Sequence, residues 1–257
     1  MRDSGEPFGR RILVLIPHPD DEVVGCAVAI RRATAAGARV FAIYLTTGLP
    51  PTETAWPWRR AEQQARLARR RAEALMVATR LQLDPVAFMD WPSRDLKNHL
   101  GEARDLVAGQ AAVLSIDQLW VPAYEGAHQD HDVANFLGAQ LRRRTEVLEF
   151  PEYNCARGVR TNEFPFATGH ETVLSLSPDE VSWKRGLVAR YRSERANLAH
   201  VGYAREVLRP LALYDYASPP HAGLLFYERF DWVPFRHPRL DFTSPADVCR
   251  ALTGPRS

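Results

Sequence analysis

Residues 12–22 read ILVLIPHPDDE and combine an apolar run with a cluster of polar side chains. Its first five residues are all apolar, and two prolines end the run. Such a short, continuous run is typical of a strand that is buried on both faces of a parallel sheet. Three acidic side chains follow directly and suit the first turn of a helix. We therefore expect a strand and then a helix over 23–36, with Gly37 at the end of the helix.

The alternation of strands and helices continues over residues 40–150. The run VFAIYL at 40–45 predicts a second buried strand, and a strand, a helix and a strand in this order form a βαβ unit. Further along, the pattern predicts strands over 86–89, 118–121 and 147–150 and helices over 58–81, 101–114 and 131–143. This order of elements predicts an α/β fold with a Rossmann-like, doubly wound and mostly parallel sheet.

The long helix predicted over 58–81 is rich in arginine and alanine. Its apolar residues recur at intervals of three and four, which predicts the face that packs on the sheet. The residues of this predicted face are Ala61, Ala65, Ala68, Ala72, Leu75 and Met76.

The C-terminal part of the chain has a less regular pattern. There we expect a loop over 151–170, a helix over 178–195 and a late strand over 224–230. We find no internal repeat and no linker, so we expect one domain over 1–257. Residues 1–9 and 254–257 are expected to be loose ends.

Composition narrows the functional class. The formal net charge is +2, which gives no reason to expect a nucleic acid as partner. The three cysteines are far apart in sequence, so we expect neither a disulfide framework nor a thiolate metal site. We find no signal peptide and no apolar run near the roughly 20 residues that cross a membrane. We expect a cytoplasmic protein with a small-molecule partner and leave its oligomeric state open.

A first polar cluster stands where the first strand ends. His18 and Asp21 are three residues apart across a tight turn and can point at one place, and imidazole with carboxylate is a common set of zinc ligands. Asp20 would face elsewhere and could take a proton from a water on the metal. Alternatively, the acids only favour the helix dipole, but that leaves His18 between two prolines unexplained.

A second cluster, His128, Asp130 and His131, follows the predicted fourth strand. We expect this loop and the HPDDE turn to meet at the carboxyl edge of the sheet, where open α/β sheets bind ligands. One histidine would be a third ligand and leave a coordination position for water, as in catalytic zinc sites. The other could act on the substrate, and Asp130 could orient a histidine. A polar surface loop is the alternative, and the pairing with the first cluster disfavours it.

These two segments, HPDDE at 18–22 and HQDH at 128–131, resemble the two-part motif of the PIG-L/LmbE family. That family contains zinc-dependent deacetylases of N-acetylglucosaminyl and other amino-sugar substrates, including antibiotic-pathway enzymes. The resemblance implies an LmbE-like fold and covers about the first 150 residues. It implies the following roles: zinc ligands His18, Asp21 and His131, general base Asp20, oxyanion stabiliser or acid His128, and Asp130 as support for the histidines.

The resemblance also suggests a residue that contacts substrate. Family members carry Arg-x-x-Glu in the second helix, with the arginine on substrate hydroxyls, and Arg70 and Glu73 match this spacing. The TTG segment at 46–48 resembles the family's loop after the second strand. In the second motif, Ala127 and Gln129 stand where the family usually has glycine and proline. Neither change touches a ligand.

Three further residues are candidates for substrate binding. Trp56 lies in the predicted loop after the second strand and could stack on a sugar ring, although aromatic residues that only anchor a loop are as common. Tyr153 and Asn154 follow the predicted fifth strand, so they too would lie at the carboxyl edge of the sheet.

Taken together, the sequence predicts a hydrolase that removes an N-acyl group, above all N-acetyl, from an amino sugar or glucosaminyl conjugate. A water activated by Zn²⁺ would attack, with Asp20 as the general base. Iron or another divalent ion in place of zinc stays open. So do an amidase acting on a long-chain acyl sugar or thiol conjugate and, in another class, a non-catalytic Rossmann-like binding module.

Overall fold

The computed structural model describes residues 7–54, 56–228 and 242–254. The strands of its main sheet are β1 (Arg11–Ile16), β2 (Arg39–Tyr44), β3 (Leu83–Phe88), β4 (Gln118–Pro122), β5 (Glu146–Phe150), β8 (Thr172–Ser175) and β9 (Arg205–Pro210). The helices are α1 (Asp21–Gly25), α2 (Ala27–Ala35), α3 (Arg60–Leu81), α4 (Leu100–Val113), α5 (Gln129–Leu141), α6 (Pro178–Val188) and α7 (Pro245–Thr253). A separate two-stranded sheet is formed by β6 (Tyr153–Asn154) and β7 (Arg160–Thr161).

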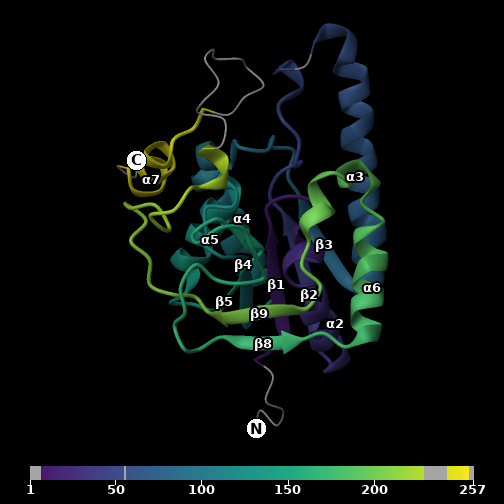
Figure 1. The fold of residues 1–257 in the computed structure, drawn as a ribbon, viewed down its shortest axis with the longest axis vertical. Coiled ribbons are helices and arrows are strands. Elements are labelled where there is room, and N and C mark those ends of the chain that lie inside the picture. The colour runs from purple at the N-terminus through teal and green to yellow at the C-terminus, as the bar shows by residue number, and fades with distance from the viewer. Residues whose placement is uncertain (1–6, 55, 229–241, 255–257) are drawn as a thin grey trace.

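The seven strands lie in the order β3-β2-β1-β4-β5-β9-β8 (Figure 1). Strands β1 to β5 are parallel, whereas β9 pairs antiparallel with β5 and β8 antiparallel with β9. The predicted α/β class and the doubly wound, mostly parallel sheet are therefore confirmed. The strands and helices predicted before residue 151 are present with shifted ends, and the helix expected over 23–36 is divided in two at Cys26.

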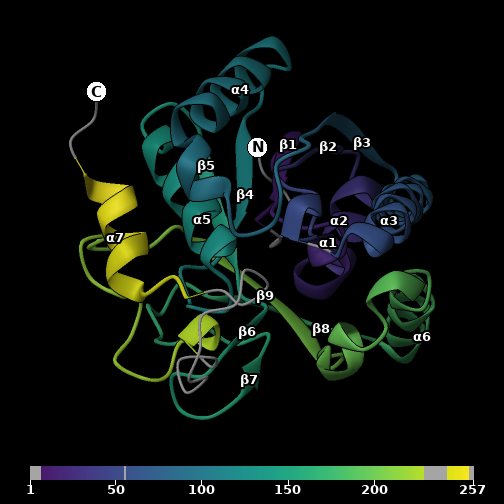
Figure 2. The ribbon, with the colours of Figure 1, turned by 90° about the horizontal axis from the view of Figure 1, so that it is seen from above.

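The continuous apolar run of β1 serves two cores. Alternate side chains of a strand point to opposite faces of a sheet. Ile12, Val14 and Ile16 enter the core under α1, α2, α3 and α6, whereas Leu13 and Leu15 enter the core under α4, α5 and α7. Figure 2 shows these two helical layers on either side of the sheet. Because both faces are covered, the strand has no polar side.

The prediction of which face of α3 packs on the sheet is wrong. The six residues of that face are exposed, and the helix is buried along the residues Arg70, Glu73, Ala74, Val77, Ala78 and Leu81. An alanine side chain buries little apolar area, so the spacing of alanines along a helix does not determine which face packs. In the last turns of α3, the larger side chains of Val77 and Leu81 enter the core. The first turns of α3 extend past the sheet (Figure 1). Among the described residues, no helix has the length and apolar character to span a membrane.

The C-terminal part differs from its predicted pattern. Helix α6 ends at Val188, short of the expected residue 195. A 3₁₀ helix occupies Phe226–Glu228 where a strand was expected, and 229 and 230 lie outside the described residues. The two C-terminal strands of the main sheet, β8 and β9, were not predicted. Of the expected loose ends, 1–6 and 255–257 also lie outside the described residues.

A buried ion pair ties this part of the chain to the first half. Lys184 Nζ donates to Glu206 Oε1 at 2.7 Å and to the carbonyl oxygen of Val24 at 2.9 Å. Glu206 also accepts the backbone N–H groups of Val28 and Ala29 in the first turn of α2. Neither charged side chain is exposed to solvent. Thus α6 and β9 are held against the two helices that follow β1.

We expect Lys184→Ala to lower the free energy of unfolding by about 3–5 kcal/mol, because it leaves the Glu206 carboxylate buried without its cation. Urea denaturation of the two proteins measures this difference. The control is Arg190→Ala, which removes an exposed cation just beyond the end of the same helix. Equal stability of the Lys184 variant and the wild type would show that the pair contributes nothing.

Candidate active site

The HPDDE turn and the HQDH segment meet at the carboxyl edge of the sheet. They follow β1 and β4, which are neighbouring parallel strands. The sheet continues away from this pair in both directions, and such a reversal point is where open α/β sheets bind ligands. A cavity of about 390 Å³ opens there. A larger cavity of about 460 Å³, beside β7 and β8, has no histidine or aspartate in its lining.

The HPDDE turn holds its side chains in fixed directions. The backbone N–H of His18 donates to Asp21 Oδ2 at 2.7 Å. Asp20 has a φ of 133°, a strained value for a residue with a side chain and one that is found mostly at functional sites. Glu22 is turned away, because it accepts the N–H of Asp20 and the hydroxyl of Tyr191. Adjacent acids therefore point to different places.

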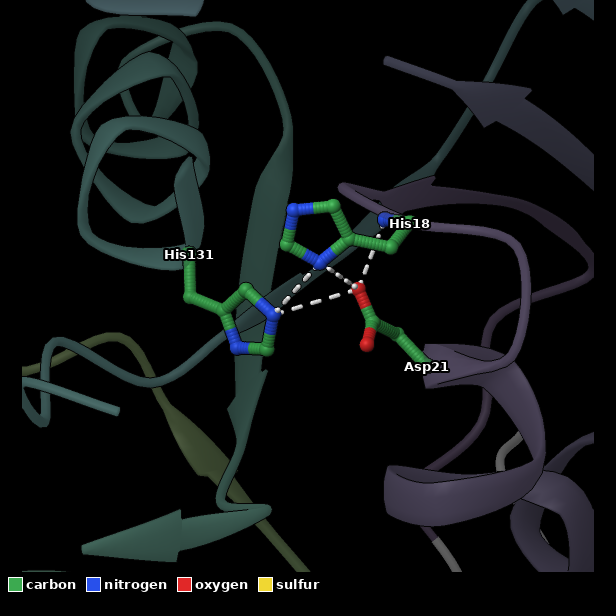
Figure 3. Close-up of side chains that lie close together, drawn as sticks. All are labelled: His18, Asp21 and His131. Atoms are coloured by element: carbon green, nitrogen blue, oxygen red, sulfur yellow. Dashed lines mark hydrogen bonds and ion pairs between the residues drawn. The ribbon is translucent and has the colours of Figure 1, made fainter. Parts of the chain in front are cut away.

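Three candidate ligand atoms converge between the two segments (Figure 3). His131 Nε2 lies 3.2 Å from His18 Nδ1 and 3.2 Å from Asp21 Oδ2. His18 Nδ1 lies 3.3 Å from Asp21 Oδ2. All three residues are buried. Two ring nitrogens at this separation cannot both present lone pairs unless a proton or a cation lies between them.

The spacing of these atoms fits a divalent metal ion. Zinc binds nitrogen and oxygen ligands at about 2.0–2.1 Å in a tetrahedron, which places neighbouring ligand atoms about 3.3–3.4 Å apart. The observed separations of 3.2–3.3 Å need almost no adjustment to reach this value. The sequence prediction that His18, Asp21 and His131 come together is thus met in space, and their role as ligands stays a proposal.

Asp130 holds the first of the two imidazoles. Its Oδ2 lies 2.9 Å from His18 Nε2 and accepts the backbone N–H of Arg94 at 2.7 Å. With a proton on Nε2, His18 keeps a lone pair on Nδ1, the atom that faces Asp21 and His131. Burial opposes ionisation of Asp130, but its histidine neighbours and the Arg94 N–H keep its pKa well below the usual range.

The charges around the ligand atoms favour a cation. Burial alone would lower the pKa of His18, but the Asp21 and Asp130 carboxylates raise it to about 10. Burial alone would raise the pKa of Asp21, but His131 and His18 hold it well below the usual range. In the metal-free protein at neutral pH, His18 is therefore protonated. A metal ion that binds Nδ1 must displace the proton from that atom.

Asp20 stands beside this group and has a different partner. Arg70 Nη2 donates to both oxygens of Asp20 at 3.2 Å, while Nη1 of the same guanidinium donates to the Gly48 carbonyl and lies 3.1 Å from Glu194 Oε1. Burial raises the pKa of Asp20 to about 7, although the positive charge of Arg70 acts to lower it. A carboxylate with a pKa near neutrality suits proton transfer at neutral pH.

His128 lies at the start of α5 and lines the same cavity. Its Nδ1 accepts the backbone N–H of Asp130 at 3.1 Å. Burial, followed by the charge of His18, lowers the pKa of His128 well below its usual value. The ring is therefore neutral, with its proton on Nε2, and can donate one hydrogen bond from that atom.

The predicted substrate-binding residues fall into two groups. Arg70 and Tyr153 line the cavity, as the sequence suggested. Asn154 and Trp56 are not part of the lining. Asn154 is buried and donates to Glu125 and to the carbonyl of Glu163, whereas Trp56 is 48% exposed and stacks on Trp58. The geometry gives Asn154 a bracing role, and substrate binding by Trp56 stays a prediction.

Several residues of the site were missed in the sequence, and three of them are polar side chains close to the proposed ligands or base. Ser93 Oγ lies 3.3 Å from His18 Nε2 and 3.4 Å from His128 Nε2, and Glu152 and Glu194 line the cavity. Glu152 directly follows Pro151 after β5, so the rule that placed Tyr153 at the carboxyl edge could have found it. Glu194 comes from the less regular C-terminal part, at the end of a segment, 190–194, that matches the family only loosely, and no role was predicted for it.

Fold and site together define an α/β protein in which two histidines and one aspartate converge at a place where a divalent metal ion could bind. Residues 13–141 match the PIG-L family, described as GlcNAc-PI de-N-acetylase, and the match spans both motifs. The chain belongs to this family. The resemblance stated from the sequence is confirmed, and so is the expectation of a metal-dependent N-deacetylase at the level of the family.

Solved structures share the fold at low sequence identity. A deacetylase from the biosynthesis pathway of teicoplanin is 20% identical with a TM-score of 0.62, and the match covers 80% of this chain and 99% of that one. A second teicoplanin deacetylase structure, a zinc inhibited form, is 19% identical over the same shares with a TM-score of 0.60. The N,N'-diacetylchitobiose deacetylase of Pyrococcus horikoshii is 16% identical, with 88% of this chain and 91% of that one covered and a TM-score of 0.57.

The fold is not restricted to deacetylases. The 4-carboxy-2-hydroxymuconate hydratase of Pseudomonas putida KT2440 is 17% identical with a TM-score of 0.51, over 80% of this chain and 98% of that one. No curated protein sequence matches this chain. The reaction must therefore be argued from the site and the family, not from the fold.

We expect zinc binding to release a proton at pH 7. A histidine must be neutral to bind a metal, and the pKa of His18 is raised to about 10. Protons thus compete with zinc, and the affinity should rise by about tenfold per pH unit between about pH 6 and 8. Calorimetry in two buffers of different ionisation enthalpy measures the released protons. An identical heat in both buffers would contradict a protonated His18.

Proposed function

We propose that this protein is a zinc-dependent hydrolase that removes an N-acetyl group from an amino sugar or glucosaminyl conjugate. One observation carries the proposal. Three ligand atoms lie within 3.3 Å of one another, directly beside a carboxylate, Asp20, that an arginine holds apart from them. A metal position and a free base at one cavity are the two parts that metal-assisted hydrolysis of an amide needs.

His18, Asp21 and His131 would hold the ion. Two imidazoles and one carboxylate make up a ligand set that occurs in catalytic zinc sites and leaves a position open. Zinc, when bound, supplies a Lewis acid that lowers the pKa of a water and polarises a carbonyl oxygen. Asp130 supports the set by fixing the proton of His18 on Nε2, away from the ion.

Asp20 is the proposed general base. Its pKa of about 7 lets it accept the proton of the attacking water and return it to the leaving nitrogen when the C–N bond breaks. Arg70 keeps both carboxylate oxygens in place through Nη2. The products are a free amine and acetate.

His128 is the proposed stabiliser of the oxyanion. Because Nδ1 already accepts the N–H of Asp130, the neutral ring carries its proton on Nε2 and can donate it as a hydrogen bond to the amide oxygen. Negative charge grows on that oxygen as the water adds to the carbonyl carbon. A donor aimed at such a charge in a buried site contributes strongly to the rate.

The substrate class rests on the family and on the cavity. The family description names an N-acetylglucosaminyl substrate, and two of the structural neighbours are deacetylases whose names refer to teicoplanin and diacetylchitobiose. The cavity walls combine the polar Arg66 and Tyr153 with the apolar Leu49, Leu198 and Phe226. This mixture suits a sugar ring that carries a larger, partly apolar group.

Acetate release tests the proposal. The zinc-loaded protein is incubated with N-acetylglucosamine, N,N'-diacetylchitobiose and N-acetylglucosaminyl-phosphatidylinositol, and acetate is measured with and without prior removal of zinc by a chelator. We expect release from at least one substrate only when zinc is present. Stoichiometric zinc with no release from any N-acetylated sugar in a wider panel would refute the deacetylase proposal.

We expect Asp20→Asn to keep zinc and to lower kcat by about a hundred- to ten-thousand-fold, because the amide cannot accept the proton of the water. Steady-state kinetics and metal analysis of the same preparation measure the two effects. The matched control is Asp90→Asn, which changes an aspartate side chain that is 91% exposed. Undiminished turnover in the Asp20 variant would rule out this residue as the base.

We expect His131→Ala to retain zinc poorly, because only His18 and Asp21 remain of the three converging ligands. Metal analysis after dialysis against a weak chelator should give well below one zinc per chain. His170→Ala, which removes an exposed histidine, is the control and should bind zinc as the wild type does. Full zinc content in the His131 variant would mean that another residue takes its place.

A further inference from the structure

Glu152 is buried and lines the cavity, yet no role has been assigned to it above. We propose that Glu152 is a positioning residue: a carboxyl oxygen accepts the Nδ1–H of His131 and so keeps Nε2 of that ring free to bind the metal. The inference rests on the metal site of the proposed function. It concerns the outer side of a ligand and not the reacting atoms.

The direction of the His131 ring requires an acceptor on its far side. Nε2 faces His18 Nδ1 and Asp21 Oδ2, so it must carry a lone pair when the ring binds an ion. A neutral imidazole then carries its proton on Nδ1. That nitrogen is buried and has no hydrogen-bond partner among the described residues. Buried polar groups without a partner are rare in folded proteins.

Glu152 supplies an unused acceptor close to this nitrogen. Its Oε1 lies 3.9 Å from His131 Nδ1, and it too is buried without a hydrogen-bond partner in the described part of the chain. The separation exceeds the usual N–H···O distance by about 1 Å. The proposed bond therefore requires a rotation about the side-chain bonds of Glu152 that brings the oxygen about 1 Å closer. A carboxyl group has an accepting oxygen in either protonation state, so the bond does not depend on the charge of Glu152.

The backbone around Glu152 is held in place for this contact. Glu125 Oε1 accepts the N–H groups of Glu152 and Tyr153 at 2.7 and 3.2 Å. Gly25 in α1 makes room on the other side, because a Cβ there would lie 3.1 Å from Glu152 Cγ and 2.3 Å from Phe150. The Glu152 side chain thus passes Gly25 on its way to the outer side of the His131 ring, and a larger residue at position 25 would crowd it.

The arrangement matches the one already seen at His18. There, Asp130 Oδ2 accepts a hydrogen bond from His18 Nε2, so that Nδ1 of the same ring is left for the ion. With Glu152 on Nδ1 of His131, each imidazole would bind with one nitrogen and be fixed by a carboxyl group on the other. Outer partners of this kind set the tautomer and orientation of a ligand, and their loss weakens metal binding by about 10- to 100-fold.

Zinc affinity of the full-length protein tests the proposal, measured by competition with a chromophoric chelator. We expect Glu152→Ala to weaken zinc binding by about 10- to 100-fold and Glu152→Gln, whose amide oxygen still accepts, to stay within about threefold of the wild type. The control is Glu163→Gln, an exposed glutamate of the same segment. An alanine variant within threefold of the wild type, or a glutamine variant as weak as alanine, would overturn the proposal.

A second measurement does not depend on how well a variant folds. In zinc-loaded wild-type protein with ¹⁵N-labelled histidine, NMR should show His131 with its proton on Nδ1 and its metal on Nε2. The opposite tautomer would overturn the proposal. Neither readout uses turnover, so a protein that binds zinc in this way but releases no acetate would refute the proposed function and leave the role of Glu152 intact.

Discussion

Two imidazole nitrogens and one carboxylate oxygen approach one another closely in a buried place, and this contact determines how the neighbouring side chains are arranged. At 3.2–3.3 Å, these atoms repel one another unless a cation or a proton lies between them. Because all three residues are buried, the outer ring nitrogens depend on partners within the protein. Asp130 meets this requirement for His18, while Asp20, at a strained backbone position, pairs with Arg70 instead.

Buried ion pairs connect the C-terminal part of the chain to the site and to the first half of the fold. Arg70 lies between Asp20 and Glu194, so a residue of the C-terminal part shares the cation that holds the proposed base. Lys184 and Glu206 join the same part to the helices after β1. A buried charge that loses its partner is strongly destabilising. The two halves of the chain are therefore coupled through ion pairs as well as through the apolar cores.

The sequence predicted the fold and the central site where simple geometry governs them. The carboxyl ends of neighbouring parallel strands meet, so His18 and His131 had to come close once their strands were recognised. Strand β9 was missed because Glu206 and Arg209 within it read as exposed charges, whereas both are buried and paired. The contact of Glu152 with His131 depends on side-chain packing across elements, which no local pattern in the sequence contains.

The cavity has walls of two different origins. The proposed ligands and base come from the turns after β1 and β4, whereas Leu198, Val201 and Phe226, which line the same cavity, come from the irregular C-terminal part. Substitutions among these three residues can alter which molecule fits without changing the proposed ligands or base. Evolution can thus diversify the specificity of such a protein while the reaction chemistry is inherited unchanged.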